Sequence, residues 1–284
     1  MKTLSISVVL SLCLLLSSCS FSIDGFTSME RINGAGEVIT EQIELDNFKD
    51  VELKKGWEVI LQPASSNFIV VEANENLLEV LEFDNQSGKL TIGALKQIYR
   101  ADAKQVTLYF SESLESLKVS SGTEVTSTEL LNFENFDLDI SSGAEVNLTL
   151  DLNILNLETS SGSDADLVLS LDELFVDTSS GSSANLEAIA ITTKVESSSG
   201  SNVTLQGNTS TLEVRTSRGS SVNSKAFESD KVIAKASSGS SISVFPVKEL
   251  TATISSGGDV NYYNKPSGRL DINKSKSGGS VTLR

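Results

Sequence analysis

Residues 157–167 read LETSSGSDADL. Nineteen residues later, 176–186 read VDTSSGSSANL, and after nineteen more, 195–205 read VESSSGSNVTL. In each stretch, apolar and polar residues alternate on both sides of the SSG string. Alternation with period two predicts two β-strands, each with one buried and one exposed face. The glycine between them predicts a corner, because a residue without Cβ can take positive φ.

The turn string SSG, or a close variant, recurs nine times at intervals of 18 to 21 residues. Its glycines are Gly122, Gly143, Gly162, Gly181, Gly200, Gly219, Gly239, Gly257 and Gly278. Of the 27 residues that lie five before, three after and five after these glycines, 24 are apolar, against 39% of the whole chain. Equivalent positions therefore stack, and the pattern predicts an all-β protein: a parallel β-helix, or β-solenoid, with ~19-residue turns.

Two other structures compete with the solenoid. A disordered Ser/Gly-rich segment does not explain apolar columns that keep their register over eight successive intervals. A β-sandwich predicts hairpins and strands of opposite direction, whereas here one turn string recurs once in each repeat. The serine pairs before the glycines are expected to pack the corner and to form stacked hydroxyl bonds.

The N-terminal part is less regular. In VELKKGWEVILQ (51–62), Gly56 occupies the turn position and the flanking apolar residues occupy the same columns. ENLLEVLEF (75–83) predicts a short helix, NQSG (85–88) a turn, and KLTIG (89–93) and QVTLYF (105–110) strands. We expect residues 31–115 to be an irregular β region that caps the stack, and residues 116–284 to be the SSG-repeat solenoid.

The first residues have the pattern of a bacterial lipoprotein signal. Lys2 precedes an apolar run from Leu4 to Leu16, which ends in Leu-Ser-Ser-Cys at Cys19. The run is too short to span a bilayer as a helix. We expect residues 1–18 to be a signal peptide, Cys19 to be lipidated, and 19–30 to be a tether. An ordinary secretory signal with a stray cysteine is the alternative. The prediction places the protein in the bacterial cell envelope as an outer-membrane lipoprotein that meets the membrane through its lipid anchor only.

Charge and composition exclude several function classes. The net charge is −16, which disfavours a nucleic-acid partner because phosphate binding needs a basic surface. The chain has no histidine, so it lacks the commonest general base and metal ligand. We predict no cofactor and no catalytic residue, since no serine is distinguished from the others and none has a histidine base.

Two polar columns are candidate sites. The column four residues after glycine is an exposed face for a glycan or protein surface, or a structural ladder of hydrogen-bonded side chains. Its central members are Asn147, Asp166, Asn185, Thr204 and Asn223. The column four before glycine stacks carboxylates whose mutual repulsion Ca²⁺ would relieve, although solvated side chains that splay apart would relieve it as well. These carboxylates belong to Asp139, Glu158, Asp177 and Glu196.

Several segments carry a family resemblance. INGAG (32–36), FKDVELKKGWEVILQ (48–62), VVEANENLLEVLEF (70–83) and GKLTIG (88–93), followed by the SSGS repeats, resemble the auto-transporter adhesin head domain family, also called the GIN domain. The likeness covers nearly all of the chain after residue 30. It implies a β-helical envelope protein and supplies no catalytic residues.

The leading hypothesis is a non-enzymatic, adhesin-like binding or assembly module that presents a polar, acidic solenoid face. A polysaccharide lyase or hydrolase is one alternative, because β-helices also carry such enzymes. A periplasmic structural or accessory protein is another.

Overall fold

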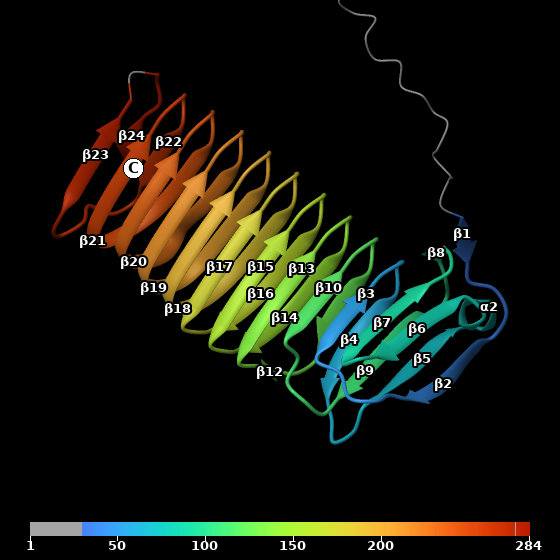
Figure 1. The fold of residues 1–284 in the computed structure, drawn as a ribbon. Coiled ribbons are helices and arrows are strands. Elements are labelled where there is room, and N and C mark those ends of the chain that lie inside the picture. The colour runs from blue at the N-terminus through green and yellow to red at the C-terminus, as the bar shows by residue number, and fades with distance from the viewer. Residues whose placement is uncertain (1–29, 276) are drawn as a thin grey trace, which may run out of the picture. The chain divides into compact units, whose positions relative to one another are not determined.

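The computed structural model describes residues 30–275 and 277–284. The expected signal peptide and Cys19 lie outside the described residues. Arg31–Arg284 form one compact unit, built almost entirely of β-strands (Figure 1).

Two parallel sheets face each other along the stack. The strands before each turn form what we name the pre-turn sheet, and the strands after it form the post-turn sheet. The pre-turn sheet contains β3 (Asp50–Leu53), β10 (Ser116–Val119), β13 (Asn135–Ile140), β15 (Ile154–Thr159), β17 (Glu173–Thr178), the second halves of β18 (Ser183–Ser197), β19 (Asn202–Thr216), β20 (Ser221–Ala236) and β21 (Ser241–Ile254), and β23 (Leu270–Lys274). The post-turn sheet contains β4 (Glu58–Pro63), β11 (Glu124–Ser127), β14 (Glu145–Asp151), β16 (Asp164–Ser170), the first halves of β18 to β21, β22 (Asp259–Tyr262) and β24 (Val281–Leu283). The short strand β12 (Leu131–Asn132) pairs with β14.

The register is the one that the repeat predicts. Val146 pairs with Ala165, Ala165 with Ala184, and Ala184 with Val203, all in parallel strands. All four side chains are at most 1% exposed. The predicted solenoid with ~19-residue turns is therefore confirmed. Its core is the column of aliphatic side chains between the two sheets.

The SSG corner is a tight turn with two left-handed residues in succession. Ser161 has φ 55° and Gly162 has φ 68°. The Ser163 N–H donates to the Ser160 carbonyl at 3.3 Å, and the Gly162 N–H donates to the Ser180 carbonyl of the next coil at 3.2 Å. Two positive φ values in the middle of a four-residue turn define a type I′ turn. The repeat predicts positive φ at the glycine but not at the serine before it.

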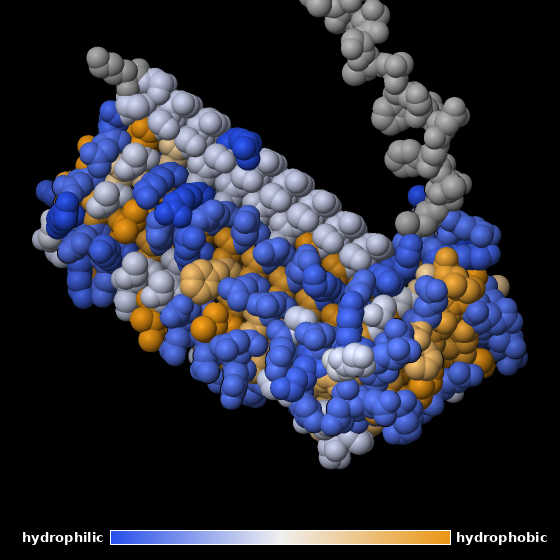
Figure 2. Space-filling model, viewed as in Figure 1, coloured by the Kyte–Doolittle hydropathy of each residue, from blue (hydrophilic) through white to orange (hydrophobic). Residues whose placement is uncertain are grey.

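The stacked hydroxyl bonds are formed mainly by the residues next to the paired serines, and not by the paired serines themselves as expected. The paired serines face outward or line the corner, and Figure 2 shows the turns as a pale serine and glycine band along one long edge. The buried hydroxyls belong to the residue after the glycine and to the residue before the serine pair. Ser182 Oγ, for example, lies 2.8 Å from the Ser179 carbonyl, 3.0 Å from the Thr159 carbonyl and 2.9 Å from Thr159 Oγ1. These bonds satisfy polar groups that burial would otherwise penalise.

The N-terminal end is closed by a mixed sheet. β3 pairs with β10 on one side and with β7 (Lys89–Ala94) on the other; β4 likewise lies between β11 and β9 (Lys104–Phe110). Antiparallel pairing then begins, with β6 (Leu81–Gln86) on β7, β5 (Phe68–Asn74) on β9, and β2 (Val38–Glu44) on β5. β1 (Arg31–Asn33) pairs with β8 (Gln97–Arg100). We call residues 31–110, without the β3–β4 coil, the cap.

The expected local elements of this region are present. The turn at residues 85–88 joins β6 to β7, and both expected strands form. The helix α2 covers only Glu75–Leu78, because the rest of the predicted helical stretch enters β6.

At the other end, the repeat alignment misplaces one residue. Counting back five from Gly278 puts Asn273 in the apolar column, but Ile272 pairs with Ala252 and therefore occupies it. Asn273 pairs with Thr253 in the outward column, and Lys274 pairs with Ile254. The reason is one additional residue between β23 and Gly278, which shifts the count without changing the strand register.

Candidate functional site

A hollow of about 650 Å³ runs along the outer face of the pre-turn sheet. It crosses six consecutive coils, from Asp50 in β3 to Glu196 in β18. Parallel strands are ~4.8 Å apart, so five intervals give a length of about 24 Å. We name it the pre-turn groove. It is lined by Asp50, Ser116, Lys118, Asp137, Leu138, Asp139, Asn156, Leu157, Glu158, Phe175, Val176, Asp177, Lys194 and Glu196.

The acidic column of the sequence lies in this groove. Asp139 pairs in register with Glu158, Glu158 with Asp177, and Asp177 with Glu196. Cations neutralise only its two ends. Lys118 Nζ lies 3.7 Å from Asp139, and Glu196 contacts Lys194 Nζ at 3.0 Å and an Arg215 nitrogen at 2.9 Å. Within residues 30–275 and 277–284, no cation lies in ion-pair distance of Glu158 or Asp177.

Two neighbouring carboxyls of the groove have opposite pKa shifts. Partial burial, with the charge of Glu196 as a second cause, raises the pKa of Asp177 above its ordinary value, while Lys194 opposes this rise. Hydrogen bonds from Lys194 and Arg215 lower the pKa of Glu196. Asp177 is therefore the carboxyl of this pair whose charged form the fold disfavours.

The described residues contain no group of three or more Cys, Asp or Glu side chains close enough to hold a metal ion. The carboxylates of the column follow one another along a line instead of converging on one point.

A second hollow, of about 440 Å³, continues the groove toward β21. It shares Asp177 and Glu196 with the first and adds Arg215, Arg218 and Lys235. Arg215 also contacts Glu213 at 2.6 Å. The charge along the face thus changes from acidic to mixed, with more cations toward the C-terminal coils.

The second predicted set lies on the opposite sheet. Asn147, Asp166, Asn185, Thr204 and Asn223 are register partners in one column of the post-turn sheet. Asn185 Nδ2 donates to Asp166 Oδ1 at 2.7 Å, as expected for a side-chain ladder. The structure brings each predicted set together in a column and separates the two sets on different faces.

The column six residues before glycine contributes groove residues that the sequence reasoning missed. Asp137, Asn156 and Phe175 belong to it, and Asn156 Nδ2 donates to Asp137 Oδ1 at 2.7 Å. Phe175 is only partly buried. Their even spacing from the acidic column was a usable signal, because residues two apart on a strand share a face.

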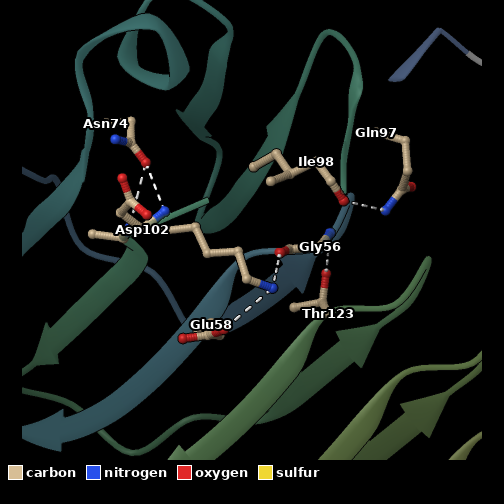
Figure 3. Close-up of polar contacts among 9 residues, drawn as sticks. Gly56, Glu58, Asn74, Gln97, Ile98, Asp102 and Thr123 are labelled. Carbon is tan, nitrogen blue, oxygen red and sulfur yellow. Dashed lines mark hydrogen bonds and ion pairs between the residues drawn. The ribbon is translucent and has the colours of Figure 1, made fainter. Parts of the chain in front are cut away.

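Figure 3 includes the polar contacts that Gly56 makes at the junction between cap and stack. Thr123 Oγ1 accepts from the Gly56 N–H at 3.1 Å, and Lys104 Nζ donates to the Gly56 carbonyl at 3.1 Å and lies 3.2 Å from Glu58. Gln97 Nε2 donates to the Ser121 carbonyl at 3.1 Å. That carbonyl occupies the position that accepts a glycine N–H in the regular coils. The cap thus completes the backbone ladder at this end.

Buried Asn74 holds the cap loop that follows β8. Its Oδ1 accepts from the Asp102 N–H at 2.9 Å (Figure 3). Its Nδ2 donates to the Gly36 carbonyl at 3.2 Å. The side chain is 1% exposed. These contacts are structural: both polar atoms of the Asn74 side chain are used inside the protein.

Among the described residues, no helix has the length and apolar character needed to cross a bilayer.

Solved structures show the same fold at low sequence identity. A protein described as "a putative adhesin from Parabacteroides merdae ATCC 43184" aligns with a TM-score of 0.68 at 17% identity, over 90% of this chain and 99% of that one. A "putative lipid binding protein from Parabacteroides distasonis ATCC 8503" gives 0.67 at 14%, over 90% and 100%. A "putative adhesin" from the same strain gives 0.65 at 16%, over 90% and 100%.

No curated protein matches the chain. A family model described as "Putative auto-transporter adhesin, head GIN domain" matches residues 47–194 and 166–266, which together span most of the chain. The chain therefore belongs to the GIN-domain family of auto-transporter adhesin heads.

Proposed function

We propose that this protein is a non-enzymatic, adhesin-like binding module of the bacterial cell envelope, and that the pre-turn groove binds a neutral or amine-bearing glycan. In this proposal Cys19 carries a lipid that anchors the protein in the outer membrane. The observation that carries the proposal is the continuous groove, which places polar side chains in register over six coils.

The groove has the chemistry that sugar rings require. Phe175 offers an apolar surface for one ring face, and the carboxylates and the Asn156 amide around it can bond to hydroxyl groups. The uncompensated charge of Glu158 and Asp177 disfavours anionic polymers and favours neutral or amine-bearing ones. A length of about 24 Å accommodates several sugar rings in a row.

The direct test is a glycan array probed with Arg31–Arg284, which contain the whole described core. Phe175→Ala should weaken binding of the best ligand about fivefold, since an aromatic contact is worth ~1 kcal/mol. Glu158→Gln should weaken binding of amine-bearing glycans more than neutral ones. Val168→Ala, an exposed substitution on the post-turn sheet, is the matched control and should bind as the parent does.

Absence of binding, or equal loss in all three variants, would contradict this assignment of the groove. If Asn185→Ala abolishes binding and Phe175→Ala does not, the ligand lies on the post-turn column instead. Running the array with and without Ca²⁺ tests whether a cation bridges the acidic column to the ligand.

The anchor is tested separately in cells. Replacing Cys19 by Ser should release the protein from the membrane fraction. Protease accessibility on intact cells then distinguishes the surface from the periplasm, where a structural or accessory role would be expected. Retention of the Cys19→Ser protein would contradict lipid anchoring.

One observation favours a second candidate, a polysaccharide-cleaving enzyme. Asp177 and Glu196 are adjacent carboxyls with pKa values shifted in opposite directions, as an acid and base pair needs. Release of reducing ends from a bound polysaccharide, lost in Asp177→Asn, would establish it. Binding without any release favours the adhesin-like function.

A further inference from the structure

The last coil leaves apolar residues of the core column uncovered. Leu270 is 37%, Ile272 40% and Leu283 49% exposed. Their register partners one coil earlier are Leu250 and Ala252, both fully buried, and Tyr262, which is 8% exposed. The difference arises because no strand among residues 30–275 and 277–284 covers the outer edge of β23 or β24.

The backbone at this edge is also unpaired. In β23, the Arg269 carbonyl accepts from Leu250 N–H at 2.9 Å, and the Ser275 N–H donates to Ile254 at 3.1 Å. Alternate residues of a strand point their backbone groups to opposite sides, so residues 270, 272 and 274 point theirs away from the stack.

The same holds for β24. The Ser280 carbonyl and the Arg284 N–H bond to the previous coil at 2.8 and 3.0 Å, so Val281 and Leu283 point their backbone groups outward. Open edges of this kind invite pairing with another strand.

The other end of the stack presents a different set of strands. There, β7 covers β3 and β9 covers β4, and the antiparallel strands of the cap follow. Two open C-terminal coils present the same strands to each other and can pair. Such a contact is two-fold symmetric and closes on itself, so it yields a dimer and not a fibre.

We propose that two copies of this chain form a dimer by pairing their last coils through β23 and β24, about a two-fold axis that passes through Ile272 and Thr282. Ile272 aligns with Ala252 and Thr282 with Asn261. Ala252 and Asn261 lie four and a half residues on either side of the turn centre between Ser256 and Gly257. Ile272 and Thr282 therefore lie equally far from the turn along their strands, so a single two-fold axis can pass through both sheets.

With this axis, β23 pairs with β23 of the second copy and β24 with β24, both in antiparallel orientation. In β24, Val281 faces Leu283 of the second copy, and both have outward backbone groups, so they form a hydrogen-bonded pair. In β23, Ile272 faces its own counterpart in the same way. Ile272, Val281 and Leu283 thus meet apolar counterparts, whereas Leu270 faces Lys274 of the second copy.

The pairing also brings groups of opposite charge together. Pairing places Arg284 of the second copy opposite Ser280. Asp259 Oδ1 accepts from the Ser280 N–H at 2.7 Å and lies 2.6 Å from Ser280 Oγ. The guanidinium thus comes next to a carboxylate twice, once for each copy. Asp271 faces Asn273 of the second copy, so no like charges are directly opposed there.

The first test is the molar mass of Arg31–Arg284 by sedimentation equilibrium up to about 1 mM protein. The parent should dimerise, and Ile272→Lys should weaken the dimer at least about tenfold, because two like charges would face each other on the axis. Ile189→Lys changes another exposed isoleucine, in β18, and should leave dimerisation unchanged. A parent that stays monomeric, or a dimer that survives Ile272→Lys, would overturn the proposal.

The second test locates the axis without relying on a disruptive variant. Residues 31–284 contain no cysteine, so Thr282→Cys introduces one thiol per copy. On the axis, two such residues form a non-hydrogen-bonded pair with Cα atoms about 4.5 Å apart, which is within disulfide range. Mild oxidation should cross-link Thr282→Cys at least about tenfold faster than Ser280→Cys, which lies off the axis. Equal rates would show that the axis is elsewhere and refute the proposed dimer.

Discussion

The turn at Gly56 and the turn at Gly162 have nearly the same backbone in different surroundings. Gly56 has φ 89° after Lys55 at 76°, and Gly162 has φ 68° after Ser161 at 55°. A Cβ on Gly162 would meet nothing within 4 Å, whereas one on Gly56 would lie 2.9 Å from both the Ile98 carbonyl and Gln97 Nε2. The same local conformation is an open corner in the stack and a covered one at the cap.

This difference extends to all the contacts that hold the two regions. Stack contacts are repeated: the glycine ladder bond recurs from Gly122 to Gly239, the aliphatic column continues through the coils, and most coils add a buried hydroxyl. Cap contacts occur once. Trp57 Nε1 donates to the Gly93 carbonyl at 2.9 Å, and Asn74 bonds the Gly36 and Asp102 backbone. We therefore expect cap substitutions to act on one end and stack substitutions to act on neighbouring coils.

The largest effect is expected for Trp57→Ala. The side chain is fully buried, so its loss should lower the free energy of unfolding by about 4 kcal/mol. Hydrogen exchange should rise in β7 and β9 and stay unchanged in β20 and β21, because solenoid contacts are between neighbours. Leu167→Ala in β16, 2% exposed, is the stack control and should raise exchange on both sides of β16. A uniform rise along the chain in Trp57→Ala would show that cap and stack form one cooperative unit.

A smaller loss of stability is expected when either turn glycine is replaced by alanine, and its size should differ between the two turns. Gly162→Ala should cost about 1 kcal/mol, the penalty for a side chain in the left-handed region. Gly56→Ala should cost about 2 to 3 kcal/mol, because the backbone carbonyl of Ile98 must also move. Urea denaturation of both variants measures the difference. Equal losses of stability would mean that the β8 backbone moves at little energetic cost. The cap would then be less tightly packed than its contacts indicate.

The smallest change in stability is expected from removing a carboxylate on the outer face of the pre-turn sheet. The raised pKa of Asp177 means that the folded state disfavours its carboxylate, so this group contributes stability at low pH that is lost as pH rises through its folded pKa. Asp177→Asn should therefore stabilise the protein at pH 7 by a few tenths of a kcal/mol, since the group is largely solvated. The gain should vanish below the ordinary pKa of 3.8.

Glu196→Gln is the matched control and should have the opposite sign. The pKa of Glu196 is lowered, so its contribution is present above the ordinary value of 4.5 and is lost as pH falls. Thermal unfolding at pH 7 and pH 3 checks both. Destabilisation by Asp177→Asn at pH 7 would contradict the unfavourable placement of its charge.

Much of the stack could be predicted from spacing alone. The recurrence of SSG and the apolar columns identified the strands, the facing of each residue and the stacking partners of Asn147 or Asp139. Periodicity could not show that the residue before the glycine, a serine in most coils and Arg218 in one, also has positive φ, because no side-chain pattern reports it. It also misplaced Asn273, since an added residue in a turn shifts a count while hydrogen bonding restores the register.

The sequence by itself determined the repeat, and with it the column in which each polar residue lies. A coil that recurs along the chain meets only its own copies, so local pattern and tertiary contact carry the same information. Only the tertiary structure decided which column borders a groove, that Phe175 lies in it, how the cap covers Gly56, and which apolar residues remain uncovered at β23 and β24. The spacing of the repeat can place Phe175 on the outer face, but the depth of the groove and the contacts of the cap depend on how side chains and non-repeating segments pack, which the spacing does not encode.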